Sequence, residues 1–312
     1  MRSSGRQPWR LPRAVAAGSL VILILMQTAA AAAEENLAKR FSVAPLLGVY
    51  SPTLHQLNKG EFKAPLPVRG RIVFQSTGEN TNYDLVVNNT LPDINYGTEA
   101  GIEFKLALTP RDALLFGASS WEGVATSVMQ TELPFQGVLS PAVYERSGRF
   151  SYFQYFLGWE RALFEPKGRL RMHGRLMLHE VFDIDYKEDL VFAFQGGPAE
   201  TFKRLIVMES QATGVLMFQL GLGAEYQARD WLSFAFDAGY AFNPRRFHLG
   251  SARLKTDIQP DDNIDMKLPA QVDSSGTLYY LSTANSYDDV AYRKVDLSLN
   301  GWRALFRVNF YF

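Results

Sequence analysis

The last eleven residues of the chain alternate between apolar and polar side chains. One parity holds Trp302, Phe306, Val308, Phe310 and Phe312, and the other holds Arg303, Arg307 and Asn309. Because successive side chains of a β-strand point to opposite faces, this segment predicts a strand with one aromatic and one charged face. Soluble sheets seldom leave so many aromatic residues uncovered, whereas a strand that faces lipid requires such a face. The segment therefore predicts a lipid-facing strand of a membrane β-barrel.

The opposite end of the chain has the three regions of a secretory signal peptide. Residues 1–13 hold four arginines and no acidic residue, and an apolar run follows over 14–26. Small residues then lead to Ala33, ahead of Glu34 and Glu35. This order predicts a cleaved signal peptide over 1–33, with a mature barrel over 34–312. An uncleaved anchor helix is the alternative. The chain has no cysteine, which excludes a lipidated lipoprotein.

Composition narrows the class of protein further. Lysine plus arginine equals aspartate plus glutamate at 32 each, so no net field favours nucleic acid, and we expect no nucleic-acid partner. Aromatic residues make up 13 % of the chain, yet the mean hydropathy is only −0.11. No apolar run after residue 33 reaches the roughly 18 residues that a membrane helix needs. Alternating lipid-facing strands produce this combination, and a soluble β-sandwich is the alternative.

Alternation recurs along the chain and defines eight predicted strands. They cover residues 43–53, 94–109, 113–129, 149–162, 169–184, 208–227, 231–246 and 293–312. The connections alternate between long or medium and short: 54–93, 110–112, 130–148, 163–168, 185–207, 228–230 and 247–292. An up-and-down membrane barrel has long external loops and short periplasmic turns, whereas a Greek-key sandwich has no reason to alternate in this way. We therefore predict an all-β, eight-stranded antiparallel up-and-down transmembrane β-barrel.

Two positions do not fit regular strands. Pro45 lacks an N–H to donate, so either the first strand begins at Leu46 or Pro45 occupies a bulge. In the last strand, Val295, Leu297 and Leu299 lie on the parity opposite to the later aromatics, and a bulge at Gly301 would restore a single apolar face.

If the apolar parity faces lipid, the opposite parity fills the lumen. The predicted luminal acids are Glu99, Glu103, Glu160, Glu225 and Asp237, with Glu122 added, and the bases are Lys105, Arg171, Arg175, Arg303 and Arg307. A symmetric turn over 163–168 would place Glu160 opposite Arg171. An eight-stranded barrel is just wide enough to be filled by side chains, and buried charges require partners. The set predicts a structural ion-pair plug, and a gated path for protons or small ions is the alternative.

Three sequence features are candidates for chemical sites. His248 and Ser251 lack the His-x-Ser spacing of outer-membrane lipid deacylases. His173 and His179 share a strand face but lie about 20 Å apart along it, so they cannot share a metal ion directly. The acidic segment 257–265 lacks the glycine and terminal glutamate of a calcium loop. We therefore expect no catalytic residues, no cofactor and no metal site, and a protein that is not an enzyme.

The rhythm over about residues 41–312, the turns at Thr109–Asp112 and Gln227–Asp230, and the final Phe312 resemble those of small Gram-negative outer-membrane β-barrels, such as the OmpA barrel domain, OmpW and the opacity proteins. The resemblance implies an outer-membrane location. It also implies that Phe310 and Phe312 form a signal read by the outer-membrane assembly machinery. Membrane lipid, lipopolysaccharide and other envelope proteins are the partners it suggests.

Three functions follow as hypotheses. The first is a non-enzymatic barrel whose external loops serve envelope integrity, adhesion or the docking of an envelope-spanning machine. The second is a narrow transporter of small hydrophobic solutes. The third is a lipid-modifying enzyme. An apolar cavity near the outer rim would favour the second, and a cluster of serine, histidine and an acid at the rim would favour the third.

Overall fold

The structure is a computed structural model of the chain, and the signal peptide predicted over 1–33 lies outside the residues that it describes. So does the acidic segment after Asp257, through residue 265. The described residues are 40–59, 61–63, 66–74, 79–87, 90–135, 138–164, 168–195, 203–257, 270–272, 278–281, 292–294 and 296–312.

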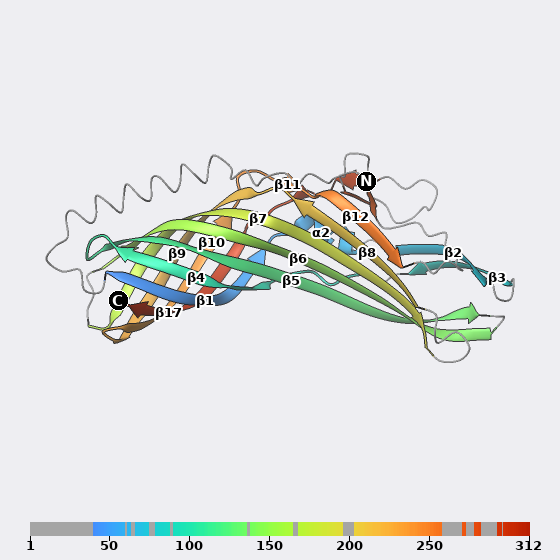
Figure 1. The fold of residues 1–312 in the computed structure, drawn as a ribbon, viewed down its shortest axis with the longest axis horizontal. Helices are drawn as coiled ribbons and strands as arrows, with labels where there is room; N and C mark the ends of the chain where they lie inside the picture. The colour runs from blue at the N-terminus through green and yellow to red at the C-terminus, as the bar shows by residue number, and fades with distance from the viewer. Residues whose placement is uncertain are drawn as a thin grey trace, which may run out of the picture.

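Eight antiparallel strands close into a ring. In order around it they are β1 (Phe41–Pro52), β4 (Gly97–Ala107), β5 (Asp112–Phe135), β6 (Val138–Ala162), β7 (Leu170–Phe194), β9 (Val215–Arg229), β10 (Leu232–Phe242) and β17 (Gly301–Tyr311). The pairing of β1 with β17 joins the first strand to the last, and the pairing of β7 with β9 completes the ring. The predicted eight-stranded antiparallel up-and-down barrel is confirmed (Figure 1).

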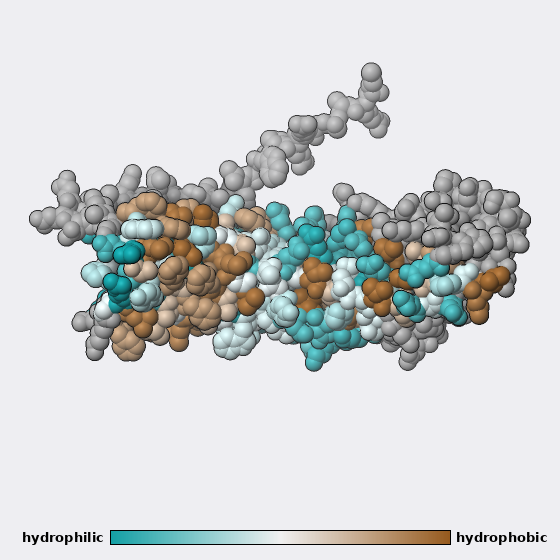
Figure 2. Space-filling model, turned by 90° about the horizontal axis from the view of Figure 1, so that it is seen from below, coloured by the Kyte–Doolittle hydropathy of each residue, from teal (hydrophilic) through white to brown (hydrophobic). Residues whose placement is uncertain are grey.

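An apolar belt covers the outside of the ring. Large hydrophobic side chains of every ring strand are exposed there, among them Leu47, Ile102, Trp159, Leu220, Phe236 and Trp302. On the face drawn in Figure 2, hydrophobic surface gathers over the half of the molecule that the ring occupies, while the other half is more hydrophilic. Aromatic pairs such as Trp231–Phe310 and Tyr240–Trp302 lie within this belt. Exposed apolar surface of this kind is suited to lipid and not to water.

Three short turns lie at one end of the ring. They connect β4 to β5, β6 to β7 and β9 to β10, and the turn before β7 includes Gly168 with a positive φ of 69°. Ser42 of β1 pairs with Tyr311 of β17 at this same end, which is the periplasmic end in a barrel of this class. The predicted short turns at the periplasmic end are therefore confirmed.

Three strands continue far beyond the ring at the other end. β5, β6 and β7 contain 24, 25 and 25 residues, whereas about 9–11 residues are enough to cross a bilayer. Their upper halves remain paired, β8 (Lys203–Ala212) joins the upper half of β7, and β12 (Gly250–Asp257) joins β8. We call this sheet the outer extension; in Figure 1 it lies to the right of the ring.

The predicted loop connections over 130–148 and 185–207 are wrong, because both segments contribute to the outer extension. These segments are mostly strand, because β5 pairs with β6 up to Phe135 and Val138, and β7 with β8 up to Ala193 and Lys203. Beyond the membrane neither sheet face must be uniformly apolar, so hydrophobic alternation fades although the backbone ladder continues. The predicted strand over 208–227 is likewise divided, between β8 and β9. The predicted strand over 231–246 ends at Phe242 of β10, and β11 (Phe247–His248) follows it as a separate strand.

The remaining elements are short and lie toward the outer end. A helix, α2 (His55–Lys59), and a 3-10 turn, η1 (Glu61–Lys63), follow β1. β2 (Leu66–Phe74) pairs with β3 (Glu79–Val87), β13 (Ala270–Val272) and β15 (Tyr292–Lys294) flank β14 (Leu278–Leu281), and β11 pairs with β16 (Asp296–Leu297). Within the described ranges, no helix is long and apolar enough to cross a membrane.

The two irregular positions have other solutions than bulges. Pro45 lies inside β1 and pairs with Ile102 of β4, while the ladder to β17 omits Ala44 and Pro45 without a change of register. Proline lacks only the backbone N–H, so a gap in one of the two ladders accommodates it without a bulge. The predicted bulge at Gly301 is wrong. Leu297 belongs to β16, and it and Leu299 are buried inside the barrel, so they need not share the lipid face.

A real bulge occurs on β7. Asp183 has a left-handed backbone with φ of 48°, and the register with β6 shifts opposite it, between Ser151 and Phe153. The extra residue reverses the parity of the strand. As a result Ile184, a residue of even number, is buried inside, although even-numbered residues lower on β7 face lipid.

Candidate functional site: the barrel lumen

The structure brings the ten predicted luminal residues together inside the ring. Nine of them are at most 4 % exposed, and the tenth, Arg171, has a side chain that is 20 % exposed at the periplasmic rim. We call these ten residues the luminal network: Glu99, Glu103, Lys105, Glu160, Arg171, Arg175, Glu225, Asp237, Arg303 and Arg307. The inward assignment of Glu122 is wrong, because its side chain is 44 % exposed and pairs with Arg149 on the outer face.

The lowest part of the luminal network centres on Lys105. Its Nζ lies 2.7 Å from Glu160 Oε1 and 3.0 Å from Glu225 Oε2, so one ammonium joins strands β4, β6 and β9. The other oxygen of Glu225 accepts hydrogen bonds from the Ser233 hydroxyl at 2.5 Å and from the Tyr311 hydroxyl. Each charge at this level therefore has partners of opposite sign or hydrogen-bond donors.

Two arginines and two acids fill the middle of the lumen. Arg307 Nε donates to Asp237 Oδ2 at 2.7 Å, and its Nη1 lies 2.5 Å from Glu103 Oε1. Arg175 contacts the same two carboxylates, Glu103 through Nη2 and Asp237 through Nη1 at 3.2 Å. His173 Nε2 lies 2.8 Å from the remaining oxygen of Asp237. This ring of alternating charge crosses the full width of the barrel, from β4 and β17 to β7 and β10.

The upper part of the luminal network is built on a forked pair. Arg303 contacts both oxygens of Glu99. Glu99 Oε1 also accepts hydrogen bonds from Ser119 Oγ at 2.7 Å and Gln154 Nε2 at 3.0 Å. Arg303 Nη1 further donates to Gln219 Oε1 at 2.7 Å. Bidentate arginine–carboxylate pairs are among the stronger polar interactions in proteins.

The cross-strand register expected from a symmetric turn is wrong by four residues. The Cα partner of Glu160 is Arg175 and not Arg171, whose own partner is Glu225 on β9. The connection between β6 and β7 extends to residue 169, which moves its centre toward β7. Arg171 Nη2 still lies 3.7 Å from Glu160 Oε1, but the closest base to this carboxylate is Lys105.

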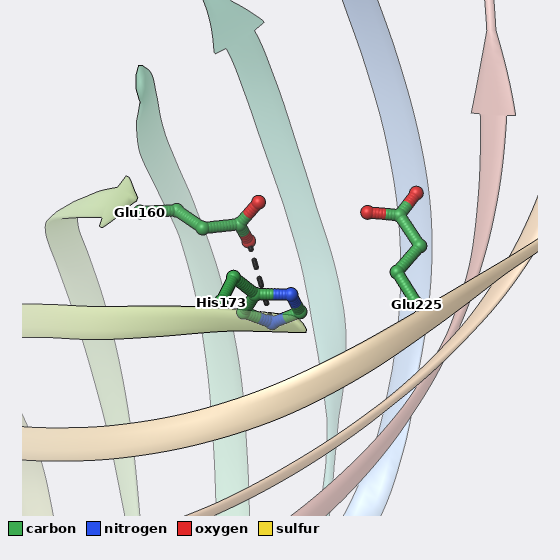
Figure 3. A group of neighbouring side chains, drawn as sticks. All are labelled: Glu160, His173 and Glu225. Atoms are coloured by element: carbon green, nitrogen blue, oxygen red, sulfur yellow. Dashed lines mark ion pairs between the residues drawn. The ribbon is translucent and has the colours of Figure 1, made fainter. Parts of the chain in front are cut away.

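Glu160, His173 and Glu225 form the one group of described residues with the spacing of a metal site. Their ligand atoms lie within 4.8 Å of one another (Figure 3). However, the Lys105 ammonium already lies between the two glutamates. His173 Nε2 is also closer to Asp237, at 2.8 Å, than to Glu160, at 3.7 Å. Because lysine and arginine groups hold these carboxylates, the geometry is that of an ion-pair network and not of a cation-binding centre.

Little free space remains between the middle and upper charges. A cavity of about 10 Å³ lies there, bounded by Glu103, Arg175, Arg303 and apolar side chains such as Met177 and Leu305. This volume is about what one water molecule requires. At this level the described side chains fill the barrel.

An apolar cluster closes the lumen above the charges. Tyr50, Trp121 and Tyr152 are buried there, Trp121 stacks on Tyr152 with ring centroids 5.4 Å apart, and its Nε1 donates to the Tyr50 carbonyl at 3.1 Å. We call this group the upper apolar cluster; its other members include Leu54, Leu57, Phe62, Leu91, Ile94, Phe150, Val181, Met217, Leu297 and Leu299.

The segment after β1 folds back into the barrel mouth to complete this cluster. Asn58 of α2 accepts a hydrogen bond from the Ile94 N–H at 2.9 Å and donates to the Ile94 carbonyl at 3.2 Å. Lys63 Nζ lies 2.7 Å from Asp93 Oδ1. Sequence reasoning treated this segment as an external loop and missed its inward side. The spacing of Leu54, Leu57 and Phe62 was the available signal.

A second buried ion pair was also missed. Arg146 of β6 and Glu188 of β7 are fully buried in the outer extension, and Arg146 Nε lies 2.6 Å from Glu188 Oε1. Both fall in segments that were expected to be loops. His248, weighed as a catalytic candidate, is exposed in β11, and the side chain of Ser251 lies outside the described part of the structure.

The closed eight-stranded ring, the exposed apolar belt and the polar lumen together define the class of protein: a transmembrane β-barrel of the outer-membrane type. No family model matches the chain, and no curated protein does. Solved structures with a similar arrangement are outer-membrane barrels, but the likenesses are weak and carry no argument about function.

Three of these structures illustrate the range of similarity. OprG from Pseudomonas aeruginosa matches with a TM-score of 0.36 and 9 % identity, over 88 % of this chain and 96 % of its own. CarO2 from Acinetobacter baumannii matches with a TM-score of 0.27 and 12 % identity, over 80 % and 99 %. The outer-membrane protease OmpT from Escherichia coli matches with a TM-score of 0.29 and 7 % identity, over 90 % and 100 %.

Proposed function

We propose that this protein is a non-enzymatic outer-membrane barrel with a sealed lumen, whose work is done at the cell surface by the outer extension and the long connections. Envelope integrity, adhesion or the docking of an envelope-spanning machine is the role that such a surface would serve. The single observation that carries the proposal is the filling of the lumen at successive levels, by the luminal network below and by the upper apolar cluster above.

Physical considerations support a structural role for the luminal network. Five acids face five bases, and close pairs cross the barrel, such as Lys105–Glu160 and Arg307–Asp237, each at 2.7 Å. A conducting pore would leave some of these groups to bind water and passing ions, whereas paired buried charges are held in place by each other. The outer extension, by contrast, adds a broad paired surface that a simple membrane anchor does not need.

Conductance tests the sealed lumen directly. We expect the purified protein, inserted in planar lipid bilayers, to show no steady current above the baseline, while an open porin prepared in the same way conducts. Heat-modifiable migration on gels and recovery with the outer-membrane fraction check that the protein is folded and inserted. Large, stable conductance would contradict the proposal, and recovery as a soluble periplasmic protein would contradict the location.

Complementation tests the role of the outer extension. In a strain that lacks the gene, we expect full-length protein to restore detergent resistance or adherence, and a chain with a shortened β5–β6 hairpin to fail while still inserting. A variant of the luminal network that inserts normally should restore the phenotype. If the shortened chain restores the phenotype fully, the outer extension is not required for detergent resistance or adherence.

A transporter of small hydrophobic solutes is the second candidate. The observation that favours it is the apolar character of the upper lumen, where Met217, Leu297 and Leu299 are buried close to the barrel wall. Solute passage would require these side chains and α2 to move. Uptake of a hydrophobic solute by vesicles that contain the protein, above the rate of empty vesicles, would support this candidate over the first.

A further inference from the structure

The ring has a notch in its wall at the upper edge of the apolar belt. The ladder between β9 and β10 ends at Phe218 and Phe242, and the ladder between β8 and β12 begins only at Gln211 and Gly250. Between these two ladders β11 turns away and pairs with β16. A cavity of about 580 Å³ occupies the gap, lined by residues 213–216, Phe218 and Pro244–His248.

Two arginines form the outer rim of the notch. Arg245 and Arg246 are exposed, and Asn243 holds their turn in place: its Nδ2 donates to the Arg245 carbonyl at 2.6 Å and its Oδ1 accepts the Leu299 N–H at 2.7 Å. In the described part of the chain, neither guanidinium has an acidic partner. By contrast, Arg149 on the same outer face pairs with Glu122 at 3.0 Å.

The floor of the notch is apolar. Leu216 and Phe218 are exposed toward the lipid side, and Phe218 stacks on Phe242 with ring centroids 5.6 Å apart. Phe247, which is 8 % exposed, closes the inner side. Glu180, the exposed partner of Leu216 on β7, is an acidic residue beside this floor. The positive charge that would attract an anion is therefore confined to the arginine rim, and the apolar floor below suits hydrocarbon.

We propose that the notch binds the phosphorylated headgroup of a lipid in the outer leaflet of the membrane. The phosphate contacts Arg245 and Arg246, and an acyl chain lies along Leu216 and Phe218. Guanidinium groups bind phosphate through two parallel hydrogen bonds, and basic side chains at the membrane boundary favour anionic lipids. The bound lipid fills the place where the ladder of the wall is interrupted. This inference rests on the outer-membrane orientation proposed above.

Lipid binding to the full-length protein tests the inference. The probes are bisphosphorylated lipid A, the same glycolipid without phosphates, and inorganic phosphate, each titrated into the protein in detergent and counted by native mass spectrometry. The test variant is Arg245→Gln with Arg246→Gln. The matched control is Arg149→Gln with Lys187→Gln, which removes two outer-face cations that already have acidic partners, Glu122 and Asp189.

We expect bisphosphorylated lipid A to bind the test variant roughly 10- to 30-fold more weakly than the wild type, and the control variant unchanged. The dephosphorylated glycolipid and inorganic phosphate should both bind weakly. If the glutamine variant does not fold, Arg245→Lys with Arg246→Lys keeps the charge without the forked geometry. Lysine still attracts phosphate but loses the paired hydrogen bonds, so a smaller loss is expected.

Three results would overturn the inference. If the wild type and the test variant bind bisphosphorylated lipid A equally well, the two arginines do not contact the lipid. Equal binding of the dephosphorylated glycolipid would indicate an apolar solute site. Displacement by inorganic phosphate alone would indicate an ion site without lipid. The conductance of the same samples keeps the two proposals apart, because a sealed barrel that fails this test leaves the proposed function intact.

Discussion

Small residues decide how closely the luminal side chains approach the wall. Gly223 faces inward on β9 beside Asp237 and His173. A Cβ placed on it would lie 2.3 Å from Asp237 Oδ1 and 2.4 Å from His173 Nε2. Asp237 is held by Arg307, and His173 by its hydrogen bond to Asp237, so they cannot simply move aside.

We therefore expect Gly223→Ala to lower the free energy of unfolding by about 1–3 kcal/mol, as is typical of overpacking. Gly174→Ala is the matched control, because a Cβ there meets only Leu163 Cδ2 at 3.5 Å and Leu222 Cδ2 at 3.9 Å. Urea unfolding in lipid vesicles, followed by tryptophan fluorescence, measures both. Equal stability of the two variants would mean that the lumen is less closely filled than described.

Replacing Arg307 should lower the free energy of unfolding more than replacing Arg171. Arg307 is fully buried and lies close to Asp237 and Glu103, so Arg307→Met leaves two acids with reduced compensation. We expect a loss of about 3–5 kcal/mol in the free energy of unfolding. Arg171 is partly exposed and 3.7 Å from Glu160, so Arg171→Met should cost no more than about 1 kcal/mol.

A second substitution tests whether lost charge balance causes the expected loss of stability in Arg307→Met. Adding Glu103→Gln to Arg307→Met removes one uncompensated acid and should recover part of the lost stability in the same urea titration. If the double variant is no more stable than the single one, the loss comes from packing and not from charge.

At this scale the sequence was informative wherever one parity faced lipid. Alternation alone placed Glu99 and Arg303 inside, on strands that are far apart in the chain. It failed for Glu122, because this residue lies where the outer face of β5 becomes polar again and both parities carry polar groups. Pairing partners could not be predicted, since they depend on the register of strands across the whole ring.

Among the elements, the last strand is bonded at its end to the start of β1 and to the residue just before β10. The Phe312 N–H donates to the Phe41 carbonyl at 2.9 Å, and the Tyr311 N–H to the Trp231 carbonyl at 2.9 Å. The side chain of Phe312 is 69 % exposed, so little of it is used in packing within the chain. An exposed aromatic side chain at this position is available to a partner during assembly.

Deletion of Phe312 should sharply reduce the amount of inserted protein and increase its degradation. Phe164→Ala is the control, because Phe164 is 70 % exposed but lies in a turn and not in the last strand. Heat-modifiable protein in outer-membrane fractions measures both. Normal levels after the deletion would contradict the role of Phe312 as an assembly signal.

The β5–β6 hairpin should be dispensable for folding. Gln130 and Val143 are paired above the membrane, so residues 131–142 can be replaced by an Asn-Gly turn without touching the ring or the Arg146–Glu188 pair. We expect normal insertion and heat-modifiable migration. Failure to insert would show that the outer extension helps to form the barrel.

The elements of the outer extension were the part of the fold that the sequence predicted least well. Segments 130–148 and 185–207 form ladders in water, where neither face needs a uniform hydrophobic pattern. The upper apolar cluster was missed for a different reason. It gathers Leu57, Trp121 and Leu297 from distant segments, and no local pattern shows that they meet.

At the scale of the whole molecule, membrane and surface functions occupy separate lengths of the same strands. The ring and its apolar belt lie at the short-turn end, and the hydrophilic half in Figure 2 belongs to the outer extension. β7 spans both, pairing with β9 in the ring and with β8 beyond it. A change in the outer extension can therefore act on the ring mainly through β5, β6 and β7.

The pairing of β1 with β17 also joins the two sides of the charge network. Of the five basic side chains in the luminal network, Arg303 and Arg307 lie on β17. Without this strand, five carboxylates would face three bases, and Glu99 would lack its forked partner. Unpaired charge is costly at membrane depth. The strand that closes the wall is therefore also the strand that brings the interior to electrical neutrality.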